Sequence, residues 1–132
     1  MSAPGTGPFG DVVHRYTRAD AIADGVLVDV TREASPAEMA GGFAVPVAVT
    51  AAVWAAIEAI PASLDGVADV RGRLHDVLWM AACAARRAKG RCAFRVHLPV
   101  AGSRAKLQRL VVHLGPGDAG EPVVTIGHAE DM

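Results

Sequence analysis

Aromatic residues and cysteines are both scarce in this sequence. Phenylalanine, tryptophan and tyrosine together make up 5% of its 132 residues, and only Cys83 and Cys92 carry a thiol. Two cysteines without metal-ligand spacing exclude a disulfide scaffold and a cysteine-based zinc site. We therefore expect two free thiols in a protein of the reducing cytoplasm.

Long apolar segments are also rare. The segment Ala44–Leu64, with Glu58 as its only charge, is long enough to cross a bilayer. Pro46 and Pro61 limit its helix to about ten residues, and alanine is a weak membrane anchor. The start of the chain, "MSAPGTGPFG", has no basic residues and no apolar core of a secretory signal. The sequence therefore predicts a buried helix and no membrane partner.

The remaining composition is that of a globular domain. The chain is 52% hydrophobic and 20% charged, and its formal net charge is -1, which gives no overall attraction to nucleic acid or membrane. A chain of this length can bury a core without disulfides. We expect residues 1–10, rich in glycine and proline, to form a flexible tail, and residues 11–132 to form a single α+β domain.

Capping signals predict the first elements. Thr17 has the character of a helix N-cap, Gly25 can end that helix in a left-handed conformation, and an apolar strand follows over Val26–Val30. Pro36 after a capping serine, followed by Gly41–Gly42, predicts a second short helix. Each of these residues has a structural explanation that requires no catalytic one.

Two longer helices are predicted next. Thr50 caps a helix over Ala51–Ile60, in which nearly every position outside the apolar stripe is alanine. A helix without a polar face is either buried on most sides or placed at a subunit interface. We therefore predict a homodimer that is formed through Trp54 and Ile57. The next helix is expected over Val70–Lys89.

Three strands close the chain. They lie in "CAFRVHL", "LQRLVVHL" and "EPVVTIG", and they predict a C-terminal antiparallel meander packed against two or three helices. The strand Val26–Val30 can join this sheet. If the first turn centres on Ala101–Arg104, Arg95 falls opposite Arg109 or its neighbour. The loop "GPGDAGEP" leads into a strand rather than a helix, so it predicts a hairpin loop and not a phosphate cradle.

Four segments together resemble a known family. "YTRADAIADGVLVDVT", "GFAVPVAVTAAVW", "GRLHDVLWM" and "GPGDAGEPVVTI" are similar to those of an uncharacterised family of short proteins. That family is a domain of unknown function met in bacterial genomes, plasmids and phages. The resemblance implies no activity and no catalytic residues, but it implies an accessory role in a mobile element.

The distribution of charge is the main functional signal. No aspartate or glutamate lies between Val77 and Gly117. The same interval holds eight of the chain's 13 basic residues, which are Arg86, Arg87, Lys89, Arg91, Arg95, Arg104, Lys106 and Arg109. Like charges side by side on a sheet cost stability, so an anionic partner or the acidic part of the fold must offset them.

From this distribution we predict a small, non-enzymatic binding protein. Its basic sheet face would contact an anionic macromolecule, either a nucleic acid or an acidic protein, unless the charges are neutralised within the fold. Aromatic stacking residues are missing from this face, which weakens the case for single-strand binding. The predicted binding residues are Arg86, Arg87, Arg91, Arg95, His97, Lys106 and Arg109.

An enzyme is the alternative. The pattern His14-x-x-Thr17 before a short helix and strand resembles the start of ADP-ribosyltransferase-like folds, in which a histidine and a nearby serine or threonine hold the nicotinamide ribose. The resemblance implies a later catalytic glutamate, for which Glu121 can be proposed. The spacing is one residue longer than the usual motif, and Thr17 is better explained as a cap.

No metal and no cofactor are expected. His97 and His113 face outward on neighbouring strands, but the predicted register separates them by roughly 17–20 Å. A metal ion holds all its ligands at about 2 Å. His75 lies on a helix, and His14 and His128 lie near the two ends of the chain. We therefore expect solvated histidines rather than a metal site.

Overall fold

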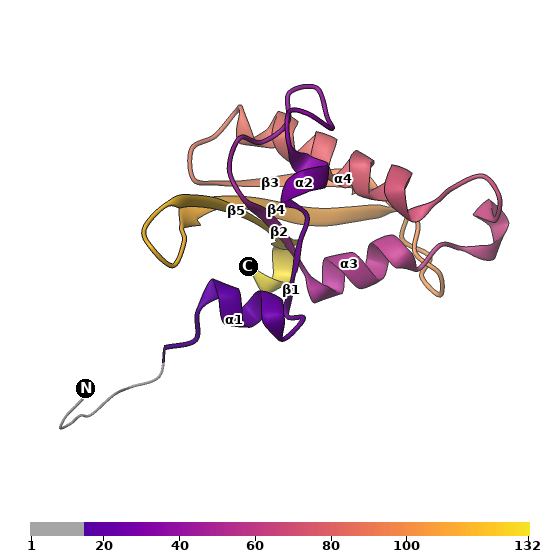
Figure 1. Cartoon of the computed structure of the whole chain (residues 1–132). Coiled ribbons are helices and arrows are strands. Elements are labelled where there is room, and N and C mark those ends of the chain that lie inside the picture. Colours follow the sequence, from indigo (N-terminus) through magenta and orange to yellow (C-terminus); the bar gives the residue numbers. More distant parts are fainter. Residues whose placement is uncertain (1–14) are drawn as a thin grey trace.

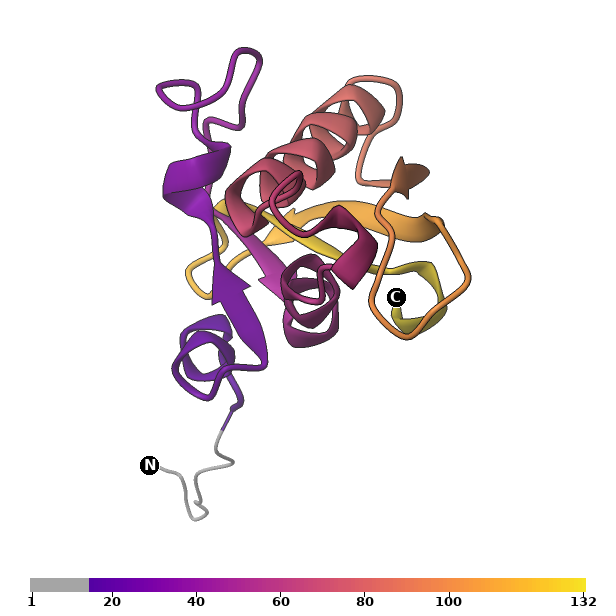
Figure 2. The same cartoon turned by 90° about the vertical axis from the view of Figure 1, so that its right-hand side faces the viewer.

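The computed structural model describes residues 15–132 (Figures 1 and 2). In chain order the elements are α1 (Arg18–Ala23), β1 (Leu27–Asp29), α2 (Thr31–Ala34), β2 (Val47–Thr50), α3 (Ala51–Glu58), η1 (Ala62–Leu64), α4 (Val70–Ala85), β3 (Arg91–His97), β4 (Leu107–Pro116), β5 (Pro122–His128) and η2 (Ala129–Asp131). The fold is α+β in a single domain, as predicted. The predicted tail over residues 1–10 lies outside the described residues.

One five-stranded sheet has the order β1-β2-β5-β4-β3. β3, β4 and β5 are neighbours and antiparallel, which confirms the predicted C-terminal meander. β1 joins the sheet, antiparallel to β2. β2 lies parallel to β5, so the sheet is mixed. The sequence pattern predicts no strand at Val47–Thr50, because the helix signal of Ala51–Ile60 dominates this apolar segment.

α3 and α4 share one core with the sheet. α4 packs mainly against β3 and β4, while α3 contacts β2 and β5. Ile57 of α3 and Leu78 of α4 are buried together with the strand residues Phe94, Leu110 and Ile126. Burial of each aliphatic side chain of this size contributes about 1.5–3 kcal/mol. This core fixes which side of β3 and β4 faces the helices and which side faces away.

The cap at the start of α1 is the one that the sequence predicts. The Thr17 hydroxyl accepts a hydrogen bond from the Asp20 amide at 3.0 Å, and the Asp20 carboxylate accepts one from the Thr17 amide at 3.0 Å. This reciprocal pair satisfies two amides that the first helical turn leaves without partners. Gly25 follows the helix with a φ of 78°, which suits glycine.

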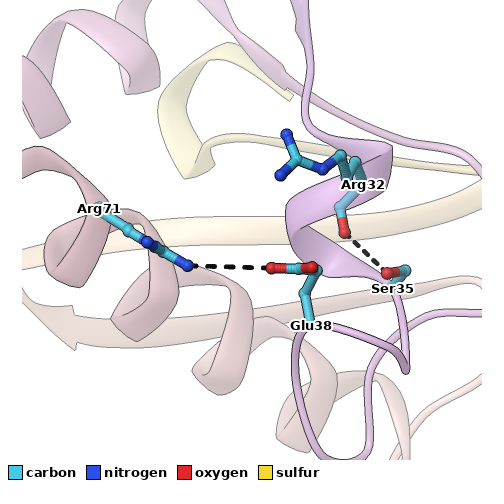
Figure 3. A network of polar contacts seen from close by, with 4 residues as sticks. All are labelled: Arg32, Ser35, Glu38 and Arg71. Atoms are coloured by element: carbon cyan, nitrogen blue, oxygen red, sulfur yellow. Dashed lines mark hydrogen bonds and ion pairs between the residues drawn. The ribbon is translucent and has the colours of Figure 1, made fainter.

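The second short helix lies before the position predicted for it. α2 ends at Ala34, and only one turn follows Ser35, in which the amides of Glu38 and Met39 donate to the Ser35 carbonyl at 3.1 and 2.9 Å. The Ser35 hydroxyl donates to the Arg32 carbonyl at 2.7 Å, so Ser35 ends α2 and also begins this turn (Figure 3). The start of α2 is set instead by Asp29, whose carboxylate accepts from the Thr31 amide at 3.0 Å. α2 therefore begins two residues after an aspartate and not after the Ser-Pro pair.

α3 is short and lies partly inside the domain. The predicted Thr50 cap is present, with its hydroxyl accepting from the Val53 amide at 3.3 Å. Ile57 has no exposed surface, and Trp54 is half-buried. The core of a single chain therefore explains much of the apolar character of this helix, and a homodimer through Trp54 and Ile57 stays a prediction with less support. Within residues 15–132, no helix is long and apolar enough to cross a membrane.

Arg73 is the one charged residue that is buried among those described. Its guanidinium donates to the carbonyls of Ile57 at 2.8 Å, Ala56 at 2.9 Å and Pro99 at 2.7 Å. Two of these carbonyls lie in the last turn of α3, where the helix itself offers no partner. Burial lowers the pKa of Arg73 from its ordinary value, while the charge of Asp76 acts in the opposite direction. No sequence motif predicts this structural role for Arg73.

Candidate anion-binding surface

The register of β3 and β4 places two arginines directly opposite each other. Arg95 pairs with Arg109, and His97 pairs with Leu107. This confirms the turn position from which the pairing was predicted. Directly opposite residues of an antiparallel pair have Cβ atoms about 4.5–5.5 Å apart. The two guanidinium groups therefore start from neighbouring points on the sheet.

The alternation along β3 and β4 separates these arginines from the core. Phe94 and Val96 of β3 and Leu110 of β4 are buried, whereas Arg95 and Arg109 are exposed. Because successive side chains of a strand point to opposite faces, the two arginines lie on the face that does not carry these core residues. β3 is also an edge strand of the sheet, so this surface is open at one side.

The structure divides the predicted binding residues, together with Lys89 and Arg104 of the same acid-free interval, between the two ends of the β3–β4 hairpin. Figure 1 shows the end of α4 and the loop between β3 and β4 at opposite ends of the sheet. We call one set the hairpin group, which consists of Arg95, His97, Arg104, Lys106 and Arg109. We call the other set the helix-end group, which consists of Arg86, Arg87, Lys89 and Arg91.

The two groups do not form a single site. Arg91 and Arg95 are four residues apart on one strand, which corresponds to roughly 13 Å. The helix-end group is also partly engaged, because Arg86 donates to the Gly41 carbonyl at 3.3 Å and Arg91 donates to the Met132 carbonyl at 2.6 Å. The predicted binding residues therefore do not all lie side by side on one face, and the binding role of each group stays a prediction.

The hairpin group has no carboxylate partner among residues 15–132. In this part of the chain, the only ion pair between a Lys or Arg and an Asp or Glu joins Arg71 to Glu38, at 3.9 Å (Figure 3). Arg71 is 89% exposed, so this pair contributes little to stability. Glu130 of η2 lines a shallow hollow together with Arg109 but makes no ion pair with it. No direct ion pair within the described fold therefore neutralises the basic hairpin.

The loop "GPGDAGEP" attaches α1 to the hairpin of β4 and β5. The Asp118 carboxylate accepts from the amides of Arg18 at 2.8 Å and Ala19 at 3.0 Å. The Arg18 guanidinium donates to the Thr125 hydroxyl at 2.6 Å and to the Val124 carbonyl at 2.7 Å. Burial lowers the pKa of Arg18, against the charges of nearby carboxylates that raise it. α1 and the loop between β4 and β5, which are far apart in the sequence, thus contact each other. No local sequence pattern predicts this contact.

Two of the three residues proposed for ADP-ribosyl transfer have structural roles. The Thr17 hydroxyl is used in the cap of α1, and the Glu121 carboxylate accepts from the Ala119 amide at 2.9 Å within its own loop. His14 lies outside the described residues. Across residues 15–132, no group of three or more His, Cys, Asp or Glu side chains is arranged to hold a metal ion.

The comparison with protein families identifies one family. Residues 8–132 match a family of unknown function, DUF6573. The chain belongs to this family. Neither a curated protein nor a solved structure matches the chain. The match covers both segments that meet at Asp118 and the whole β3–β4 hairpin, but family membership assigns no activity to them.

Proposed function

We propose that this member of DUF6573 is a small, non-enzymatic binding protein whose hairpin group contacts the phosphates of a nucleic acid. The observation that supports the proposal is the direct pairing of Arg95 with Arg109, both exposed and without a carboxylate partner in the described chain. Opposed like charges destabilise a sheet. An anion that lies between the two guanidinium groups removes this cost.

The chemistry of arginine favours phosphate as the anion. A guanidinium group is a planar fork that donates two parallel hydrogen bonds to phosphate oxygens. Such contacts position a protein on the nucleic-acid backbone and do not read its sequence. The hairpin group includes no phenylalanine, tyrosine or tryptophan on which bases could stack. We therefore expect salt-dependent binding with little sequence preference, and an acidic protein is the competing partner.

Two further proposals concern the setting of this activity. We infer that the protein acts in the cytoplasm, and its two free cysteines, Cys83 and Cys92, are consistent with a reducing compartment. An accessory role in a plasmid or phage is proposed from the resemblance of the four sequence segments quoted above.

Salt-dependent binding to a fluorescent DNA duplex and to an RNA of equal length tests the proposal. Log affinity falls with log salt in proportion to the number of neutralised phosphates, with a slope of about -0.9 per contact. We expect Arg95→Glu with Arg109→Glu to weaken binding at low salt and to reduce the slope by about 2. The measurement is fluorescence anisotropy over a series of salt concentrations.

A matched double variant separates local from overall charge. Arg32→Glu with Arg71→Glu changes the net charge equally, at exposed positions outside the hairpin group. Arg18 is unsuitable as a control because it anchors α1 to β5. If the two double variants bind equally, or if the parent binds no nucleic acid at low salt, the proposal is wrong. Binding to an acidic protein but not to nucleic acid would assign the hairpin group to the competing partner.

A further inference from the structure

An apolar cavity opens beside the end of α4, away from the hairpin group. Its volume is 430 Å³. Its walls come from Phe43 and Val45 before β2, from Ala88 after α4, and from Cys92 and Val112 of the sheet. Both the volume and the apolar walls are typical of small-molecule pockets.

The cavity lies where β4 extends beyond the helix that packs on it. The 16 residues of α4 span about 24 Å, whereas the 10 residues of β4 span about 33 Å. Leu114 of β4 lines the cavity and is 47% exposed, and Cys92 of β3 is only partly buried. Apolar side chains of the sheet therefore face solvent at the end where the helix no longer covers them.

The rim of the cavity carries charge of one sign. Lys89 and Arg91 are among its lining residues, and Arg86 and Arg87 precede them in the chain. Arg91 is held by the Met132 carbonyl, but Lys89 makes no side-chain hydrogen bond or ion pair with any residue in the described part of the chain. An apolar interior below an available ammonium group suits a ligand with an apolar body and one negative charge.

We infer that this cavity binds a small amphipathic carboxylate, an alkyl or aryl acid. The apolar body fills the space between Val45, Ala88 and Val112, and the carboxylate accepts a charge-assisted hydrogen bond from Lys89 at the rim. A neutral molecule with the same body keeps the apolar contacts but loses this bond. No residue of the hairpin group lines the cavity, so ligand binding in the cavity can be tested independently of nucleic-acid binding.

The two cysteines provide a test on the unmodified full-length chain. Cys92 lines the cavity, whereas Cys83 is partly exposed outside it and serves as an internal control. We expect decanoate to slow the alkylation of Cys92 by iodoacetamide and to leave Cys83 unchanged, as measured by mass spectrometry of peptides. Decanol should protect Cys92 up to about fivefold less well at equal concentration, because a partly exposed charged contact is worth up to about 1 kcal/mol. Acetate should give no protection.

Two variants and one control variant locate the ligand. Lys89→Glu should abolish the preference for decanoate over decanol, and Lys106→Glu, with the same change in net charge outside the cavity, should retain it. Ala88→Trp fills the cavity from its rim and should slow Cys92 alkylation without any ligand. Equal protection by decanoate and decanol would overturn the carboxylate assignment. If neither decanoate nor decanol protects Cys92, the cavity is not a ligand site. If Cys92 becomes protected without ligand as the protein concentration rises, and light scattering gives the mass of a dimer, a second copy of the chain occupies the cavity.

Discussion

The arginine at α1 and the arginines at the β3–β4 hairpin differ in the contacts that they make within the fold. At α1, Arg18 reaches the Thr125 hydroxyl, and Asp118 accepts from the first amides of the helix, so both charges hold two segments together. At the hairpin, Arg95 and Arg109 face each other and make no ion pair within residues 15–132. The charges of the first region stabilise the fold, whereas those of the second make no ion pair in the described part of the chain.

The comparison shows that partner atoms, and not residue type, separate structural arginines from available ones. Arg18 and Arg73 donate to carbonyl and hydroxyl oxygens, and burial lowers the pKa of both. Neither depends on an ion pair with a carboxylate. A count of positive and negative charges in the sequence therefore treats these two arginines as equivalent to Arg95 and Arg109, although they are not.

The largest effect is expected at Arg73. Arg73→Ala removes three hydrogen bonds to the carbonyls of Ala56, Ile57 and Pro99 and leaves these groups without partners in a buried site. Unsatisfied buried groups and the lost packing should lower the free energy of unfolding by about 3–5 kcal/mol. Urea denaturation followed by circular dichroism measures the change.

Arg71 provides the control for this experiment. It lies two residues away on the same helix, and its ion pair with Glu38 is solvent-exposed. Arg71→Ala should cost about 0.5 kcal/mol or less. If Arg73→Ala unfolds at the same urea concentration as Arg71→Ala, the carbonyl contacts of Arg73 do not support the fold.

A smaller effect is expected where α1 meets the loop between β4 and β5. Asp118→Ala removes the acceptor for two amides at the start of α1, and Arg18→Ala removes the contacts with β5. Each change should cost about 1–2 kcal/mol. Because the two residues fasten the same helix, the double variant should lose less than the sum of the single losses. Additive losses in urea denaturation would show that the two contacts act separately.

Local signals predicted the elements whose determinants lie close together in the sequence. The Thr17 and Thr50 caps were correct because each depends on an amide only three residues away. The pairing of Arg95 with Arg109 followed from a single turn between two adjacent strands. In each case a short stretch of chain contains all the atoms that decide the geometry.

Contacts between distant segments were not predictable in the same way. The parallel pairing of β2 with β5 and the contact of Asp118 with α1 both join residues that are far apart in the chain. Arg86 was grouped with Arg95 because both lie in the acid-free interval, but α4 directs Arg86 towards Gly41. Charge clustering in a sequence therefore indicated a basic region but did not locate the surface that presents it.

The smallest effect is expected at the available arginines themselves, and it should have the opposite sign. Arg95→Thr removes one of two opposed positive charges, so it should raise the free energy of unfolding by about 0.5 kcal/mol at low salt. Salt screens exposed charges over about 10 Å at 0.1 M, so the part of this gain that comes from repulsion should disappear in concentrated salt. Urea denaturation measures the change in the free energy of unfolding at low salt and at high salt.

A double-variant cycle isolates the repulsion from the higher β-propensity of threonine. Threonine favours a strand at any salt concentration, so its intrinsic benefit persists when the charges are screened. The cycle combines Arg95→Thr with Arg109→Thr. If the two arginines repel each other, the second substitution should raise the free energy of unfolding by less than the first at low salt, and the two increases should become additive at high salt. Additive gains at both salt concentrations would show that the two guanidinium groups do not interact. An anion between the two groups would then relieve no repulsion, even though both arginines are exposed.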